Sequence, residues 1–239
     1  MKSKHFIPLL ALPVLALNSQ AAILITGGHV DIVAFEYESV ADGGGGFEAE
    51  IHNEGGPDGA IVNGVREEIE SHYEPDDTTI VIADSSSTVF DLNTYFWLPS
   101  DETEAANNGV PFAGFGLEEL ADADWNGDLT FTLTSVVFSG TGTGRFLLWT
   151  DSPAEILHFD SAALANFNSI SLSPDTHTHY NWGFSDVGTY EMTIEISGVH
   201  VDDGFQFGSA TYTFQVVPEP STALMGALGA LALLRRKRG

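Results

Sequence analysis

Apolar and polar residues alternate along most of the chain between residues 23 and 217, and short clusters of Gly, Asn, Asp and Pro interrupt the alternation. A period of two is typical of β-strands, in which successive side chains point to opposite faces of a sheet. The clearest case is the segment 189–196, whose inner face is expected to carry Tyr190, Met192, Ile194 and Ile196. Its Thr and Glu residues are expected to face solvent, as in a half-buried antiparallel strand.

Three further segments, 29–38, 129–138 and 205–217, show the same alternation. In the first of them it predicts one shared face for His29, Asp31, Val33, Phe35 and Tyr37. The four glycines from Gly43 to Gly46 are expected to form a turn between two strands.

Helical patterns are weak and are confined to residues 65–73 and 162–167. The sequence therefore predicts an all-β fold, an antiparallel β-sandwich of jelly-roll or immunoglobulin-like type. Residues 22–217 are expected to form one such domain, because their number suits a single β-sandwich.

The N-terminus has the pattern of a secretory signal peptide. Lys2 and Lys4 precede an apolar run over residues 6–17, and the small residues Ser19 and Ala21 follow it. Such an order predicts a signal peptide over residues 1–21 with cleavage after Ala21.

The C-terminus consists of Pro218-Glu219-Pro220, a short apolar stretch over residues 222–234 and a basic cluster over residues 235–238. In this order the three parts closely resemble the PEP-CTERM sorting signal that exosortases process. The resemblance implies a sorting segment over 218–239 and transient anchoring in the inner membrane through 222–234. It further implies partnership with the secretion machinery and exosortase, and then delivery to the cell surface or an exopolysaccharide matrix. Whether the mature form is tethered or released is left open.

The region between these ends is strongly acidic. Residues 22–217 contain 33 acidic residues but only Arg66 and Arg145 as cations, which gives a formal charge of −31. Because phosphate recognition needs basic residues, nucleic acid is excluded as a partner. Adaptation to salt and binding of cations both remain as explanations of the charge. The chain contains no cysteine, which excludes disulfides, thiol catalysis and cysteine-ligated metal sites.

A second resemblance covers most of the body. It rests on the motifs GHVDI at 28–32, FWLP at 96–99, WNGD at 125–128, GTGRFLLW at 142–149 and HTHYNWGF at 177–184. Their order and spacing are similar to those of the surface-anchored domain called choice-of-anchor M. The resemblance implies a surface-anchored module and brings no established activity.

Two closely spaced pairs of potential ligands stand out among the body's histidines. His29 lies two residues before Asp31, and His177 lies two residues before His179. In a strand such positions share a face, with α-carbons about 7 Å apart, so both side chains can reach one ion. Imidazole and carboxylate ligands suit zinc or another transition metal. We therefore expect a metal site made by these four residues, if the fold brings the two segments together.

A second candidate is a calcium loop over residues 122–128. Asp122, Asp124, Asn126 and Asp128 alternate as the oxygen ligands of a calcium loop do. The twelfth position is Leu133 rather than Glu, so the segment does not match an EF-hand.

The sequence contains neither a G-x-S-x-G nor an H-E-x-x-H motif, and no catalytic residue is predicted. We expect a non-catalytic surface module that binds metal. A carbohydrate-binding matrix protein that uses exposed tryptophans and a metal-dependent hydrolase are the alternatives.

Overall fold

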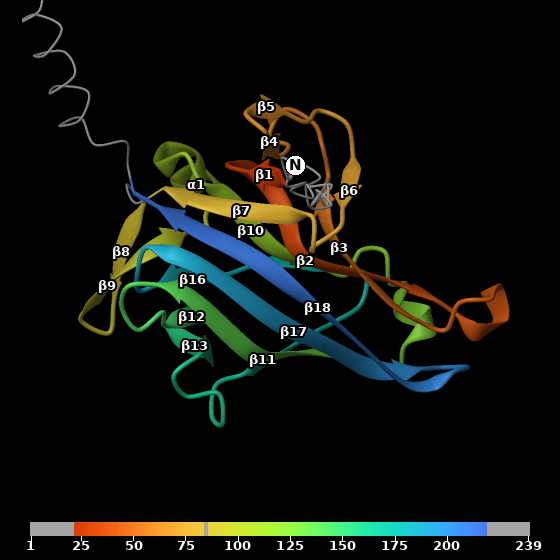
Figure 1. The fold of residues 1–239 in the computed structure, drawn as a ribbon. Helices are drawn as coiled ribbons and strands as arrows, with labels where there is room; N and C mark the ends of the chain where they lie inside the picture. Colours follow the sequence, from red (N-terminus) through yellow and green to blue (C-terminus); the bar gives the residue numbers. More distant parts are fainter. Residues whose placement is uncertain (1–21, 84–85, 219–239) are drawn as a thin grey trace, which may run out of the picture.

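A computed structural model of the protein describes residues 22–83 and 86–218. The largest sheet, here called the large sheet, has eight strands. Their order is β14 (Ser169–Leu172), β11 (Leu129–Gly140), β17 (Gly188–His200), β18 (Gly204–Val217), β7 (Thr78–Ala83), β1 (Ile23–Ile25), β4 (Ile61–Val62) and β5 (Val65–Arg66). Figure 1 shows β17 and β18 crossing the front of the molecule as a long antiparallel pair.

Two further sheets have five strands each. The first, here called the histidine sheet, has the order β15 (His177–His179), β10 (Pro111–Gly116), β2 (Gly28–Glu38), β3 (Gly46–Asn53) and β6 (Ser71–Tyr73). The third sheet has the order β13 (Ile156–Asp160), β12 (Phe146–Thr150), β16 (Asn181–Phe184), β9 (Asn93–Leu98) and β8 (Ser87–Phe90). The prediction of an all-β fold is confirmed.

Aromatic side chains join the three sheets in one core. Phe131 of the large sheet lies 6.0 Å from Phe35 and 5.2 Å from Phe115 of the histidine sheet, measured between ring centroids. Trp182 of the third sheet stacks on Phe115 at 5.3 Å and contacts Phe214 of the large sheet at 5.4 Å. Each of these rings is buried, and full burial of such a side chain contributes about 1.5–3 kcal/mol. The large sheet therefore packs against both smaller sheets.

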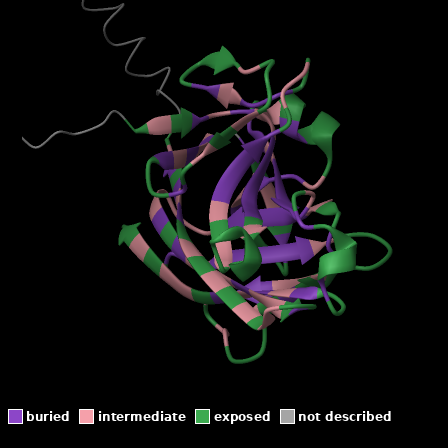
Figure 2. Cartoon of the chain, turned by 90° about the vertical axis from the view of Figure 1, so that its right-hand side faces the viewer, coloured by how far each residue is buried: buried purple, intermediate pink, exposed green. Residues whose placement is uncertain are grey.

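The strand β17 follows its predicted pattern. Tyr190, Met192, Ile194 and Ile196 are fully buried, whereas Glu191 is exposed. Figure 2 shows such alternation as colour stripes along several strands, with exposed positions concentrated in the turns. The turn at Gly43 to Gly46 connects β2 with β3 as expected, through a 3-10 turn, η1 (Val40–Asp42).

The predicted shared face of the first long strand is wrong beyond Asp31. Opposite His52 and Glu50 of β3, the strand β2 has one residue more than its neighbour, and this bulge lies between Asp31 and Ala34. A bulge shifts the alternation by one position. Val33 and Phe35 consequently enter the core, whereas the side chain of Asp31 contacts polar groups on the opposite face of the sheet.

Other local differences concern strand direction and helices. Most strand pairs are antiparallel, but β1 with β7, β2 with β10 and β7 with β18 are parallel. The weak helical pattern at residues 65–73 was misleading, because β5 and β6 lie there, and residues 162–167 form turns. The helix α1 (Glu102–Asn108) was not expected, although Asp101 caps it by accepting a hydrogen bond from the Glu104 amide.

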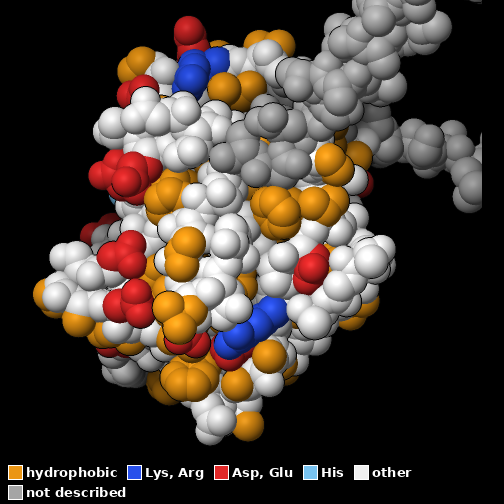
Figure 3. Space-filling model, turned by 90° about the vertical axis from the view of Figure 1, so that its left-hand side faces the viewer, with side chains coloured by type: hydrophobic (Ala, Val, Ile, Leu, Met, Phe, Trp, Pro, Cys, Tyr) orange, Lys and Arg blue, Asp and Glu red, His pale blue; other side chains and the backbone are white. Residues whose placement is uncertain are grey.

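The surface carries little positive charge. Figure 3 shows one face, on which acidic side chains are spread widely and basic ones are few. One of the two arginines in the described part of the chain, Arg145, forms a two-bond ion pair with Asp160, with N–O distances of 2.9 and 2.7 Å. Burial opposes ionisation of Asp160, but the bonds from Arg145 and the Ala162 amide outweigh it and lower the pKa of Asp160.

Candidate metal centre

The histidine sheet places its candidate ligands in one row. In register across its five strands lie His179, Gly114, Asp31, His52 and His72. Side chains at paired positions of neighbouring strands project from the same face of a sheet. The face opposite to the core therefore carries imidazole and carboxylate groups side by side, from segments as far apart in sequence as β2 and β15.

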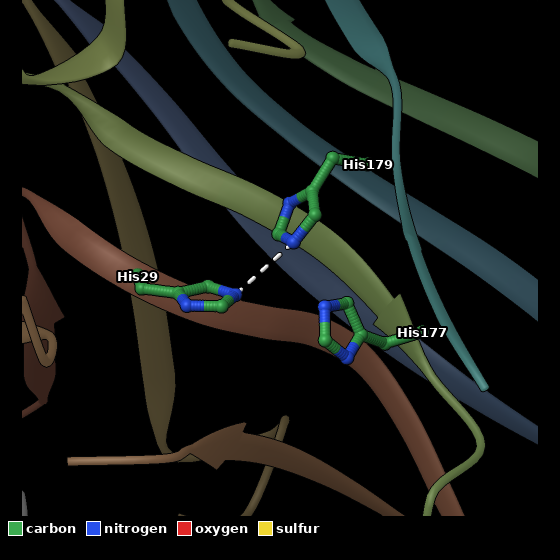
Figure 4. Close-up of side chains that lie close together, drawn as sticks. All are labelled: His29, His177 and His179. Carbon is green, nitrogen blue, oxygen red and sulfur yellow. Dashed lines mark hydrogen bonds between the residues drawn. The ribbon is translucent and has the colours of Figure 1, made fainter. Parts of the chain in front are cut away.

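Three histidines of this face form a triad. The Nε2 atoms of His29 and His179 lie 3.0 Å apart, so that one ring donates a hydrogen bond to the other. The ring centroid of His177 lies 5.7 Å from that of His29 and 5.4 Å from that of His179. One nitrogen from each ring lies within 4.8 Å of the others. Figure 4 shows the three rings facing one another around a common point.

Carboxylates lie next to the other nitrogens of two of these rings. Nδ1 of His177 donates a hydrogen bond to Oε1 of Glu118, and it lies 3.6 Å from Oε1 of Glu54. The other oxygen of Glu54 lies 3.7 Å from Nδ1 of His29. Histidines that bind metal characteristically have such a partner on the second nitrogen, because it fixes the ring's orientation and tautomer. Nε2 of His177 is thereby left for a ligand, and Nε2 of His29 faces Nε2 of His179, where a bound ion would replace their mutual hydrogen bond.

The surroundings keep His179 neutral. Burial, together with the neighbouring His29, lowers the pKa of His179 to about 3. Phe112 stacks on its ring with centroids 3.6 Å apart and holds it in place. A neutral imidazole is the form that coordinates a metal. His177 differs: burial lowers its pKa, but Glu118 and the nearby charge of Asp31 outweigh burial and raise it.

Asp31 is the least satisfied polar group of the face. Its side chain is 0% exposed, and neither carboxylate oxygen has a hydrogen-bond partner among the described residues. Burial raises its pKa to about 7, the charges of Glu118 and Glu54 add to this, and His177 opposes it. An unpaired buried carboxylate is costly, and a bound cation would offset that cost.

Two glycines make room for this arrangement. A Cβ atom on Gly114 would lie 1.9 Å from Oδ1 of Asp31 and 2.9 Å from Cε1 of His179. A Cβ atom on Gly116 would lie 3.1 Å from Oδ2 of Asp31. No larger residue fits at Gly114 without displacing a candidate ligand.

The structure thus brings together all four residues singled out as a transition-metal site. His29, His177 and His179 form one group, and Asp31 forms a second group with His177, Glu54 and Glu118. Sequence reasoning missed both glutamates, and it also missed a third group, His52, Glu70 and His72. The period-two pattern of Glu48, Glu50 and His52 was the available signal for β3, since it marks a polar face.

The candidate calcium ligands lie elsewhere. Asp122–Asp124 form a 3-10 turn, η2, and Asp128 accepts a hydrogen bond from the Ser173 hydroxyl at 2.9 Å. Within the described parts of the chain, Asp122, Asp124 and Asp128 do not form a group with oxygens within 4.8 Å of one another. Calcium binding there, with Asn126 as a further ligand, stays a prediction.

Comparison with known protein families gives one match. Residues 216–238 match the PEP-CTERM protein-sorting motif. This motif marks the chain as an exported protein that is sorted to the cell surface and processed by an exosortase. A search of the curated proteins and a search of the solved structures find no match. The resemblance of the body to the choice-of-anchor M domain receives no support from these comparisons and stays a prediction.

Most of the two terminal signals lies outside the described residues. The predicted signal peptide with Ala21, and Glu219 and Pro220 of the sorting motif, fall there, whereas β18 ends at Val217 directly before Pro218. Among the described residues, no helix has the length and apolar character needed to span a bilayer.

Proposed function

We propose that this exported protein is a surface metal-binding module in which His29, His177 and His179 coordinate one transition-metal ion through Nε2. The observation that carries the proposal is the convergence of three imidazoles from two distant segments, two of them with carboxylates on Nδ1. Three nitrogen ligands suit zinc first, and copper, nickel or iron next. Asp31 lies beside the site and would provide negative charge to the ion.

The charge of the body supports the same function. A formal charge of −31 over residues 22–217 attracts cations to the surface, and only two arginines compete with them. We further propose that the processed body resides at the cell surface or in an exopolysaccharide matrix, where it captures metal ions or is stabilised by them.

The alternatives receive different support. Sugar binding through exposed tryptophans is not favoured, because Trp125, Trp149 and Trp182 are buried and Trp97 is half-buried. A metal-dependent hydrolase would use the coordination position that three histidines leave open. Hydrolysis is therefore the second candidate function. It would be favoured if the zinc-loaded protein turned over a chromogenic ester or phosphoester and His177→Ala did not.

The proposal is tested by zinc-dependent thermal stability of the purified protein. An ion at 100 times its dissociation constant stabilises the folded state by about 2.7 kcal/mol, which raises Tm by several degrees. We expect this rise in the wild type and a much smaller one in His177→Ala. His158→Ala is the matched control, because His158 bonds the Thr150 hydroxyl on the third sheet and belongs to none of the ligand groups found among the described residues. An equal rise in wild type and His177→Ala overturns the proposal.

A further inference from the structure

A second group of ligands lies on the same face, at the other end of the row. His52 and His72 are paired across β3 and β6, and their rings stack with centroids 4.8 Å apart. Oε1 of Glu70 lies 3.4 Å from Nε2 of His52 and 4.0 Å from Nε2 of His72. The three ligand atoms of this group lie within 4.8 Å of one another.

The remaining nitrogens of these two rings face carboxylates, as in the triad. Nδ1 of His72 donates a hydrogen bond to Oε2 of Glu50, and Nδ1 of His52 lies 3.9 Å from Oε2 of Glu118. Each of these glutamates has one buried oxygen with no hydrogen-bond partner in residues 22–83 and 86–218, namely Oε1 of Glu50 and Oε2 of Glu118. Each Nε2 atom is thus directed to Glu70 while each Nδ1 atom has an acidic neighbour. That is the ring orientation expected of metal-binding histidines.

Glu118 connects the two groups. Its Oε1 accepts the hydrogen bond from His177 of the triad, and its Oε2 faces His52. One carboxylate therefore lies between one histidine of each group, hydrogen-bonded to His177 and 3.9 Å from Nδ1 of His52. Because both rings present Nδ1 to this carboxylate, their Nε2 atoms point to separate places rather than to a shared ion.

We propose that His52, His72 and Glu70 bind a second transition-metal ion, and that Glu118 supports this site and the triad together. Two imidazoles and one carboxylate form a ligand set that zinc accepts, with a fourth position for water. The role of Glu118 at both sites rests on the proposed function. The second site itself is argued only from His52, His72 and Glu70. The side chains of His72 and Glu70 are 45% and 60% exposed, so this ion is expected to exchange faster than the one in the triad.

The test is the number of zinc ions that the purified protein binds, measured by calorimetric titration after chelation. We expect two ions for the wild type, one for His177→Gln and one for His72→Gln. Glu118→Gln is expected to weaken both sites, by about 10-fold or more, as loss of such an orienting partner commonly does. Glu119→Gln is the matched control, since it removes the same charge from an exposed neighbouring position.

The outcomes separate the two proposals. One ion in the wild type that disappears in His177→Gln but not in His72→Gln overturns the second site and leaves the triad. One ion that disappears only in His72→Gln overturns the triad and leaves the second site. Two ions with equal affinities in Glu118→Gln and Glu119→Gln overturn the role of Glu118. Circular dichroism of the chelated variants checks the fold, which His72→Gln is expected to keep because this side chain is partly exposed.

Discussion

Replacing Asp31 by Asn is expected to stabilise the metal-free protein and to weaken its response to zinc. Asp31 is 0% exposed, its two oxygens find no hydrogen-bond partner in the part of the chain that the structure describes, and burial raises its pKa from 3.8 to about 7. A difference of about three pKa units between folded and unfolded states corresponds to about 4 kcal/mol of unfolding free energy. Above the folded-state pKa, this free energy opposes folding.

The sign follows from proton binding. Between about pH 4 and pH 7 the folded state holds more protons than the unfolded state, so wild-type stability falls as pH rises through this range. The amide that replaces the carboxylate in Asp31→Asn does not titrate, so the variant avoids the free-energy cost of an ionised Asp31. Leaving the amide buried and unpaired costs about 1–3 kcal/mol, which reduces this advantage. We therefore expect Asp31→Asn to be about 1–3 kcal/mol more stable than wild type at about pH 8 in chelator. Each kcal/mol shifts Tm by about 2–4 °C in a domain of this size.

With zinc bound, the wild type is expected to be more stable than Asp31→Asn, because the ion places a positive charge next to the Asp31 carboxylate. The assay is thermal unfolding of both proteins with chelator and with zinc, at about pH 4.5 and about pH 8. In chelator, the difference in Tm between Asp31→Asn and wild type should become smaller or change sign at the lower pH. The reasoning is refuted if the variant is less stable than wild type in chelator at the higher pH, or if zinc stabilises both proteins equally.

Two further substitutions test other parts of the account. Gly114→Ala places a Cβ atom 1.9 Å from Oδ1 of Asp31, so we expect weaker zinc binding and a loss of about 1–3 kcal/mol, measured by titration and melting. In Gly46→Ala the added Cβ atom meets no atom of the described residues within 4 Å, so zinc binding and stability should stay unchanged. Similar behaviour of the two variants would contradict the steric argument. Asp160→Asn breaks the bidentate pair with Arg145 and should cost about 3 kcal/mol in denaturant unfolding at neutral pH. Because the folded-state pKa of Asp160 is lowered, the stability that this pair adds is lost as pH falls below about 4, and a pH-independent deficit would argue against it.

The sequence predicted those features that depend on local alternation. The buried positions of β17 follow from the period of Tyr190, Met192, Ile194 and Ile196, because one face of this strand is buried and the other is not. The two-residue spacings of His29 with Asp31 and of His177 with His179 likewise indicated which side chains share a face. In both cases the relevant contacts lie within one strand.

Features that depend on strand order could not be predicted in this way. The two histidine segments meet because β10 lies between β2 and β15, and no local pattern specifies that neighbour. The bulge after Asp31 moves Val33 into the core, against the simple alternation. Glu118 follows the end of β10 in a loop, so its place between His177 and His52 depends on the assembled sheet.

The central claim is that the Nε2 atoms of His29, His177 and His179 share one metal ion. Its most direct test is an anomalous difference map at the zinc absorption edge, from crystals of the protein grown with zinc. We expect a peak between the three rings, at about 2.0–2.1 Å from each Nε2 atom. Zinc bound at other residues while the triad keeps its direct hydrogen bond between His29 and His179 would contradict it.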